Sequence, residues 1–236
     1  MSIHERKPPI TYAQIIFLFL TVAILALSIC FYFNFLTGEK WASIISGLLT
    51  GLIIMLFQAF LSWYEFKTID KYRSLGVVDI LSNRKNQEYY GNLISKSNRE
   101  IKVLGVTALS FLEDFASKNP NTKEDQLLKA LKIKSVKVKI LVAHESYLDE
   151  RHRRKAIEAE SRLKELSSQD NFEFKYYKHI PAHSIMIIDD ECLAGPVFPE
   201  VKSQDTPTIH LNRYSQLAKY YEDYFNNEWN DAETRS

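Results

Sequence analysis

The side chains best suited to hold a charged ligand form one basic run, residues 151–155, with the sequence Arg-His-Arg-Arg-Lys. Guanidinium and ammonium groups bind phosphates, so this run is suited to contact nucleic acid, a nucleotide or anionic lipid headgroups. Glutamates at 150, 158 and 160 interleave with it, however, and the solvated face of a charged helix explains the same pattern. Both interpretations stay open. The candidate binding residues are Arg151, Arg153, Arg154 and Lys155.

Two histidines, His179 and His183, form a second group of reactive side chains. Pro181 lies between them and disfavours the helix that would place residues four apart on one face, and a zinc site needs more ligands. The sequence also has no glycine-rich phosphate loop, Ser-His-Asp arrangement or cysteine-based metal site. We therefore expect no metal and no cofactor. His183 can equally have a purely structural role, in which it follows the Pro181 kink and forms a hydrogen bond within a sheet.

Two long uncharged runs dominate the first quarter of the 236-residue chain. No Asp, Glu, Lys or Arg occurs from residue 8 to 38, or from 41 to 64. A helix needs about 20 mostly apolar residues to cross a bilayer, and each run is long enough. The pattern predicts an α-helical transmembrane hairpin, and a buried hairpin in a soluble protein is the alternative. The expected segments are a cytoplasmic tail at 1–9, helices at 10–36 and 41–64, and an external loop at 37–40.

Basic residues on either side of these runs predict how the hairpin is oriented. Arg6 and Lys7 precede the first run, and residues 67–73 after the second contain two lysines and an arginine. Because Lys and Arg concentrate in cytoplasmic loops, we expect both termini in the cytoplasm. Cys30 and Cys192 fall in separate regions, so we expect them to be unpaired and reduced.

Small residues recur at intervals of four in the second run, at Ser43, Gly47 and Gly51. Residues at this spacing share one helix face, which lets another helix backbone approach closely. Packing against the first helix of the same chain and packing between protomers explain this small-residue strip equally well. Because a two-helix hairpin cannot enclose a pore by itself, membrane permeation would require a homo-oligomer.

The remaining sequence is rich in charge and predicts a juxtamembrane helical linker at 65–98, followed by a cytosolic α/β domain at 99–236. Strands that alternate with helices favour a mixed sheet. The formal net charge of +1 gives no reason to expect direct nucleic-acid binding. Alternating or apolar patterns predict strands at 100–107, 136–142, 172–177, 184–188, 192–194 and 208–211, and helical patterns predict helices at 81–94, 110–116, 125–131, 147–166 and 214–229.

The order of these elements resembles one half of a phospholipase D-like domain, over roughly residues 99–232. His183-Ser184-Ile185, with Asp190 seven residues after the histidine, is similar to the HxK(x)4D motif of that family. The resemblance implies that His183 attacks phosphorus and that Asp190 orients or protonates a partner group. In the family a lysine also clamps the phosphate oxygens, and two copies of the motif converge.

This chain departs from the family pattern in ways that disfavour catalysis. Ile185 occupies the lysine position, Gly195-Pro196 stands where a Gly-Ser pair is expected, and the motif occurs once. Without the lysine, a phosphoryl transition state loses its nearest positive charge, and electrostatic stabilisation is usually the largest catalytic contribution. The sequence therefore leans away from an enzyme and favours an inactive fold kept for binding or sensing.

A two-span anchor joined to a small sensor-like domain resembles the membrane effectors of bacterial anti-phage systems, including retron and cyclic-nucleotide-signalling types. That resemblance implies a toxin-like effector that oligomerises when triggered and disrupts the inner membrane, causing abortive infection. Its trigger would be a reverse transcriptase–nucleic acid complex or a nucleotide signal, and its other partner is the lipid bilayer. The alternatives are a membrane-anchored phosphodiesterase or nuclease that uses His183, and a passive anchor for a cytosolic partner.

Overall fold

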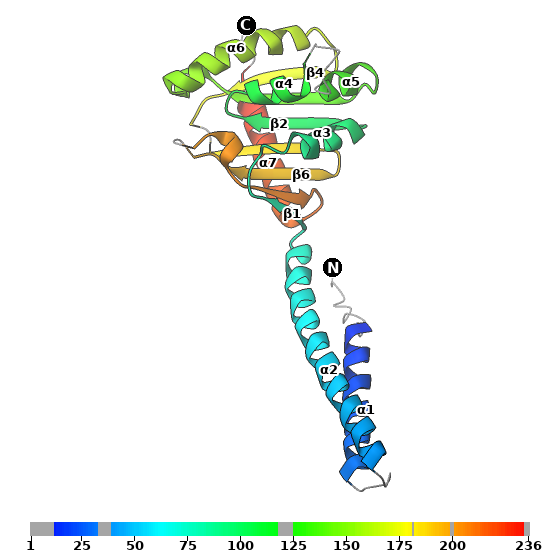
Figure 1. Ribbon diagram of the computed structural model, residues 1–236. Helices are drawn as coiled ribbons and strands as arrows, with labels where there is room; N and C mark the ends of the chain where they lie inside the picture. Colours follow the sequence, from blue (N-terminus) through cyan, green and yellow to red (C-terminus); the bar gives the residue numbers. More distant parts are fainter. Residues whose placement is uncertain (1–11, 33–38, 118–124, 181, 199–200, 234–236) are drawn as a thin grey trace, which may run out of the picture. The chain divides into compact units, whose positions relative to one another are not determined.

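The computed structural model describes residues 12–32, 39–117, 125–180, 182–198 and 201–233 (Figure 1). The chain divides into two compact units, Met1–Tyr72 and Arg73–Ser236. The first contains helix α1 (Tyr12–Tyr32) and most of helix α2 (Glu39–Ser74), and the second contains the sheet and the remaining helices. Each unit is described separately below.

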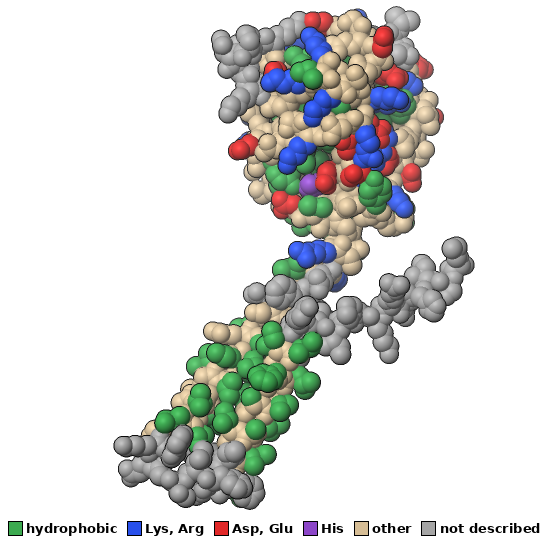
Figure 2. All heavy atoms as spheres, turned by 90° about the vertical axis from the view of Figure 1, so that its right-hand side faces the viewer, with side chains coloured by type: hydrophobic (Ala, Val, Ile, Leu, Met, Phe, Trp, Pro, Cys, Tyr) green, Lys and Arg blue, Asp and Glu red, His purple; other side chains and the backbone are tan. Residues whose placement is uncertain are grey.

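One helix in the described part of the chain is long and apolar enough to cross a membrane. This is Ser43–Tyr64 within α2, whose mean hydropathy is 2.2 and of which 6% is buried. Ile15–Ile29 in α1 is a shorter apolar helix. Large hydrophobic side chains are exposed along both, and Figure 2 shows them covering the described surface of this unit. The structure therefore provides one candidate span, and the second span of the predicted hairpin stays a prediction.

The boundaries around α2 differ from those expected. Helix α2 already begins at Glu39, inside the predicted loop at 37–40, whereas residues 37 and 38 lie outside the described residues. The helix ends at Ser74, and Gly76 follows with φ +80°, the left-handed conformation that glycine adopts easily at a helix end. Gly76 thus marks the end of the helix.

The predicted helical linker at 65–98 is wrong beyond Gly76. Strand β1 (Val77–Leu81) and helix α3 (Gln87–Lys96) belong to the α/β unit. The strand pairs with β7 (Thr208–Asn212), near the other end of the sequence, with Leu81 opposite Thr208. A strand whose only partner is so distant in sequence leaves little local pattern, which explains why the α/β domain was predicted to begin too late.

A seven-stranded mixed sheet forms the second unit, in the order β1-β7-β6-β5-β2-β3-β4. Strands β2, β3 and β4 are parallel, and the other neighbouring pairs are antiparallel. The predicted mixed α/β fold is confirmed. The remaining strands are β2 (Glu100–Gly105), β3 (Lys137–Ala143), β4 (Phe172–Tyr177), β5 (His183–Ile188) and β6 (Glu191–Pro196).

Helices cover the two faces of the sheet unequally. Helices α3, α4 (Leu109–Phe115), α5 (Gln126–Lys132) and α6 (Glu150–Leu166) pack on one face, where their apolar residues join Ile101 and Val103 of β2. Helix α7 (Gln216–Asp231) packs on the other face, through Phe225 and Trp229 (Figure 1). Because successive strand residues point to opposite faces, each strand contributes to both cores.

Candidate functional site

A cavity of about 440 Å³ opens at one end of the sheet, on the face covered by α3 to α6. It lies where β1 and β2 end and where β5 and β7 begin, and it includes residues 105–111 from the β2–α4 connection. Ligands commonly bind outside the carboxyl ends of parallel strands, because the loops and helix ends gather there. The size is within the usual range for small-molecule sites.

The side chain of Arg84 is the most constrained cation in this cavity. Its Nε donates to Thr208 Oγ1 at 2.8 Å, its Nη1 to Ser203 Oγ at 3.0 Å, and its Nη2 to the Pro196 carbonyl at 3.1 Å. All three acceptors are neutral. Burial lowers the pKa of Arg84, and only the nearby Tyr90 opposes that effect. A partly buried guanidinium whose acceptors are neutral keeps its full positive charge available to an anion.

Gly195 of β6 leaves the space that Arg84 occupies. A Cβ at this position would lie 2.6 Å from Arg84 Nη2 and 2.3 Å from the Pro207 carbonyl oxygen. Tyr90 of α3 also lines the cavity and is 5% exposed. Its hydroxyl has no hydrogen-bond partner of good geometry among the described residues. Burial raises the pKa of Tyr90, although Thr208 and Arg84 act in the opposite direction.

Helix α6 brings part of the predicted basic run to the same cavity. Asp149 caps this helix by accepting from the His152 backbone N–H, and Ala159, Leu163 and Leu166 bury its inner face. The helical repeat places residues four apart on one face. Arg151 and Lys155 accordingly line the cavity.

The other two predicted basic residues of α6 do not line it. Arg153 donates to the carbonyl oxygens of Glu145 and Leu148, and Arg154 is exposed. The basic run is thus divided: Arg151 and Lys155 line the cavity, whereas Arg154 lies on the exposed face of α6.

The floor of the cavity is apolar. Val103, Met186 and Leu193 come from three adjacent strands, and Phe111 and Phe115 of α4 add aromatic walls. Two carboxylates, those of Glu113 and Asp114, also reach the lining. The cavity therefore combines a cationic rim with a surface that suits a flat or apolar group.

His183 begins β5 at the same end of the sheet but faces away from this cavity. Its half-buried ring packs edge-on against Tyr221 and Tyr224 of α7, with ring centroids 5.9 and 5.4 Å away. Ile185, at the position of the family lysine, is 1% exposed in the α7-side core. Ser184, between them in sequence, points to the opposite face and lines the cavity. His183 therefore lies at the same end of the sheet as the cavity, but on the other face.

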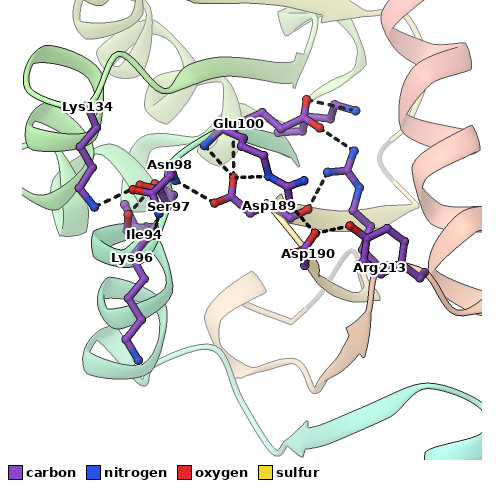
Figure 3. Close-up of polar contacts among 12 residues, drawn as sticks. Ile94, Lys96, Ser97, Asn98, Glu100, Lys134, Asp189, Asp190 and Arg213 are labelled. Carbon is purple, nitrogen blue, oxygen red and sulfur yellow. Dashed lines mark hydrogen bonds and ion pairs between the residues drawn. The ribbon is translucent and has the colours of Figure 1, made fainter.

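Asp190 lies at the far end of β5, in the turn before β6. It accepts from Tyr214 Oη and forms an ion pair with Arg99, and both contacts lower its pKa (Figure 3). A strand rises about 3.3 Å per residue, so Asp190 and His183 lie more than about 15 Å apart. The structure does not bring this predicted pair together.

The neighbouring Asp189 shows what this turn does. With φ +49°, it directs its carboxylate to the backbone N–H groups of Asn98, Arg99 and Glu100 at 2.8 to 3.0 Å (Figure 3). Arg213 donates to the Asp189 carbonyl and to Glu100. These bonds join the β5–β6 turn to the start of β2. Asp190 thus belongs to a network that holds the sheet together.

Sequence reasoning missed Arg84, Tyr90, Ser203 and Thr208 as site residues. The three hydrogen-bond acceptors of Arg84 lie more than a hundred positions later in the sequence. Only the position of Arg84 shortly after a strand could have indicated its role, and the sequence pattern did not predict that strand, β1.

Comparisons with known proteins give distant likenesses to solved structures. No family model and no curated protein matches the chain. TrmBL2, described as an archaeal chromatin protein with a novel mode of DNA binding, is 14% identical with a TM-score of 0.46, over 79% of this chain and 70% of that one. Phosphatidylserine synthase of Haemophilus influenzae Rd KW20 is 14% identical with a TM-score of 0.41, over 63% of this chain and 35% of that one. Neither likeness is close enough to assign a function.

The crowding at Gly195 predicts a selective loss of stability. Gly195→Ala should lower the free energy of unfolding by about 1–3 kcal/mol, because the new Cβ meets a backbone carbonyl that cannot move freely. Gly105→Ala is the matched control, since nothing lies within 4 Å of a Cβ there. Thermal unfolding of the two purified variants, followed by circular dichroism, measures the difference. Equal midpoints would contradict the packing described around Arg84.

Proposed function

We propose that this protein is a non-enzymatic membrane effector whose α/β unit receives a small anionic signal and whose N-terminal helices act in a bacterial inner membrane. The observation that carries the proposal is α2. Its residues 43–64 are apolar and almost wholly unburied, and the same helix continues to Ser74, directly before the α/β unit. A bilayer would cover the large hydrophobic side chains that this helix exposes.

The biological setting that we propose is anti-phage defence. A signal produced during infection would bind the α/β unit, the membrane helices of several protomers would associate, and the disrupted membrane would end the infection together with the host cell. The basic flanks of the uncharged runs support this arrangement, because they favour two spans with both termini in the cytoplasm.

The placement of the candidate catalytic residues supports a non-enzymatic role. His183 contacts two tyrosine rings, Asp190 takes part in the network at the other end of β5, and buried Ile185 replaces the lysine that would bind phosphate. A phosphodiesterase needs these groups to converge on one phosphorus atom. The cationic cavity lies on the other face of the sheet and suits binding.

The small-residue strip of α2 supports association between protomers. Gly47 and Gly51 are exposed, and no described atom lies within 4 Å of a Cβ built on either. Ser43 is exposed as well. Close packing of another helix at these positions would add contacts that lipid tails replace poorly. Packing within the chain does not use the two glycines among the described residues, which favours packing between chains.

The number of spans is tested by reporter fusions at residue 5 and at residue 236. Two spans place both ends in the cytoplasm, so a reporter that is active only in the cytoplasm should be active at both positions. A single span through α2 would place the two ends on opposite sides of the membrane. Activity at residue 236 alone would therefore overturn the hairpin and leave one span.

Disruption of the small-residue strip should separate membrane insertion from effector activity. The double variant Gly47→Ile/Gly51→Ile should insert normally, because the helix becomes more apolar, but it should neither form crosslinked oligomers nor depolarise bacterial cells. Ala59→Ile adds the same kind of bulk on a different face of α2 and should leave both properties unchanged.

The measurements are a voltage-sensitive dye in phage-infected bacterial cells that express the protein, and chemical crosslinking in the membranes of those cells. Depolarisation by the double variant at the level of the unmodified protein would contradict the effector proposal. Membrane insertion without depolarisation by either protein would instead identify a passive anchor.

A further inference from the structure

The cavity beside Arg84 has an excess of positive charge. Five cations line it, namely Arg84, Lys85, Arg151, Lys155 and Lys202, against the two carboxylates of Glu113 and Asp114. Lys85 is already paired with Asp205 at 2.5 Å. Arg151 and Lys155 form no ion pair with any residue that the structure describes. An anion that entered the cavity would therefore meet cations that are not already neutralised.

Arg84 adds directional donors to this charge. A guanidinium carries five N–H groups, and three of those on Arg84 are occupied by Thr208, Ser203 and Pro196. These contacts fix the plane of the group, so that little further side-chain freedom would be lost on binding. A fixed guanidinium with N–H groups to spare suits a phosphate, which accepts two parallel hydrogen bonds from such a fork.

Tyr90 adds a hydroxyl that is buried beside Arg84 and has no hydrogen-bond partner of good geometry among the described residues. Because an unsatisfied buried polar group is costly, such a group often marks a place that a ligand or water completes. Its ring forms part of the wall, together with Phe111 and Phe115. Hydroxyl and arginine donors thus lie next to an aromatic and apolar surface that inorganic phosphate alone would leave unfilled.

We propose that this cavity binds a nucleotide, with its phosphates toward Arg84, Arg151 and Lys155 and its base on the apolar floor formed by Val103, Met186 and Leu193. The binding itself follows from the cavity. That the nucleotide is the signal for membrane action rests on the function proposed above.

Isothermal titration of the full-length protein in detergent tests the proposal. The probes are ATP, GTP, CTP, UTP, cyclic di-AMP and cyclic di-GMP, with adenosine and inorganic phosphate as the two halves of the ligand. At least one nucleotide should bind, and neither half should bind as tightly. A 5′-phosphorylated oligonucleotide is included because its terminus carries a phosphate and a base, as a free nucleotide does.

Variants of α6 locate the site without disturbing the core. Arg151→Ala and Lys155→Ala should each weaken nucleotide binding by about tenfold, because each removes a charge-assisted contact to phosphate. Arg154→Ala is the matched control on the same helix, and it should bind like the unmodified protein because Arg154 does not line the cavity. Arg84→Lys keeps the charge but loses the fork, so it should also weaken binding.

Three results would overturn the proposal. The first is that no nucleotide binds. The second is that the Arg151→Ala and Lys155→Ala variants bind nucleotide as tightly as the Arg154→Ala control. The third is that the oligonucleotide binds and no free nucleotide does. The last would indicate a nucleic-acid terminus as the ligand. None of these results depends on depolarisation, so failure of the nucleotide site and failure of the membrane effector are distinguished.

Discussion

A guanidinium held partly out of water by neutral acceptors constrains one whole end of this sheet. Arg84 follows β1 and donates to Pro196, Ser203 and Thr208, which lie at the end of β6, in the β6–β7 connection and at the start of β7. The segment that follows the edge strand β1 is thereby tied to β6, to β7 and to the connection between them. Gly195 has to remain without a side chain for Arg84 to lie there. The same charge that orders this end of the domain also sets the character of the cavity beside it.

Strand alternation explains why adjacent residues of the His183-Ser184-Ile185 motif face opposite sides of the sheet. His183 and Ser184 are adjacent in β5, and the pleat directs one toward the tyrosines of α7 and the other into the cavity. A pattern match to a catalytic motif identifies the strand but not the face on which the ligand would lie. In this chain the cavity lined by Arg84, Arg151 and Lys155 lies on the face opposite the histidine. The network around Asp189 and Asp190 holds the other end of the strand in place.

The parts of the fold that could be predicted from sequence are those with local patterns. The alternation in residues 136–142 and 172–177 predicted β3 and β4, and the charged amphipathic pattern before Leu166 predicted α6. Strand β1 was not predicted because its pairing partner lies near the C-terminal end of the chain, and the role of Arg84 was not predicted for the same reason. Of the four basic residues proposed from sequence, two line the cavity. The helical repeat was sufficient to group Arg151 with Lys155, but not to say which face meets the sheet.

We expect a ligand to bind on the α4–α6 side of this end of the sheet and not on the side of His183. Hydrogen exchange of backbone amides, measured by mass spectrometry with and without the bound nucleotide, tests it most directly. The account predicts slower exchange in residues 84–91, 105–111 and 202–208, which surround the cavity. Slower exchange confined to residues 176–184 and 217–225, around His183, would contradict it.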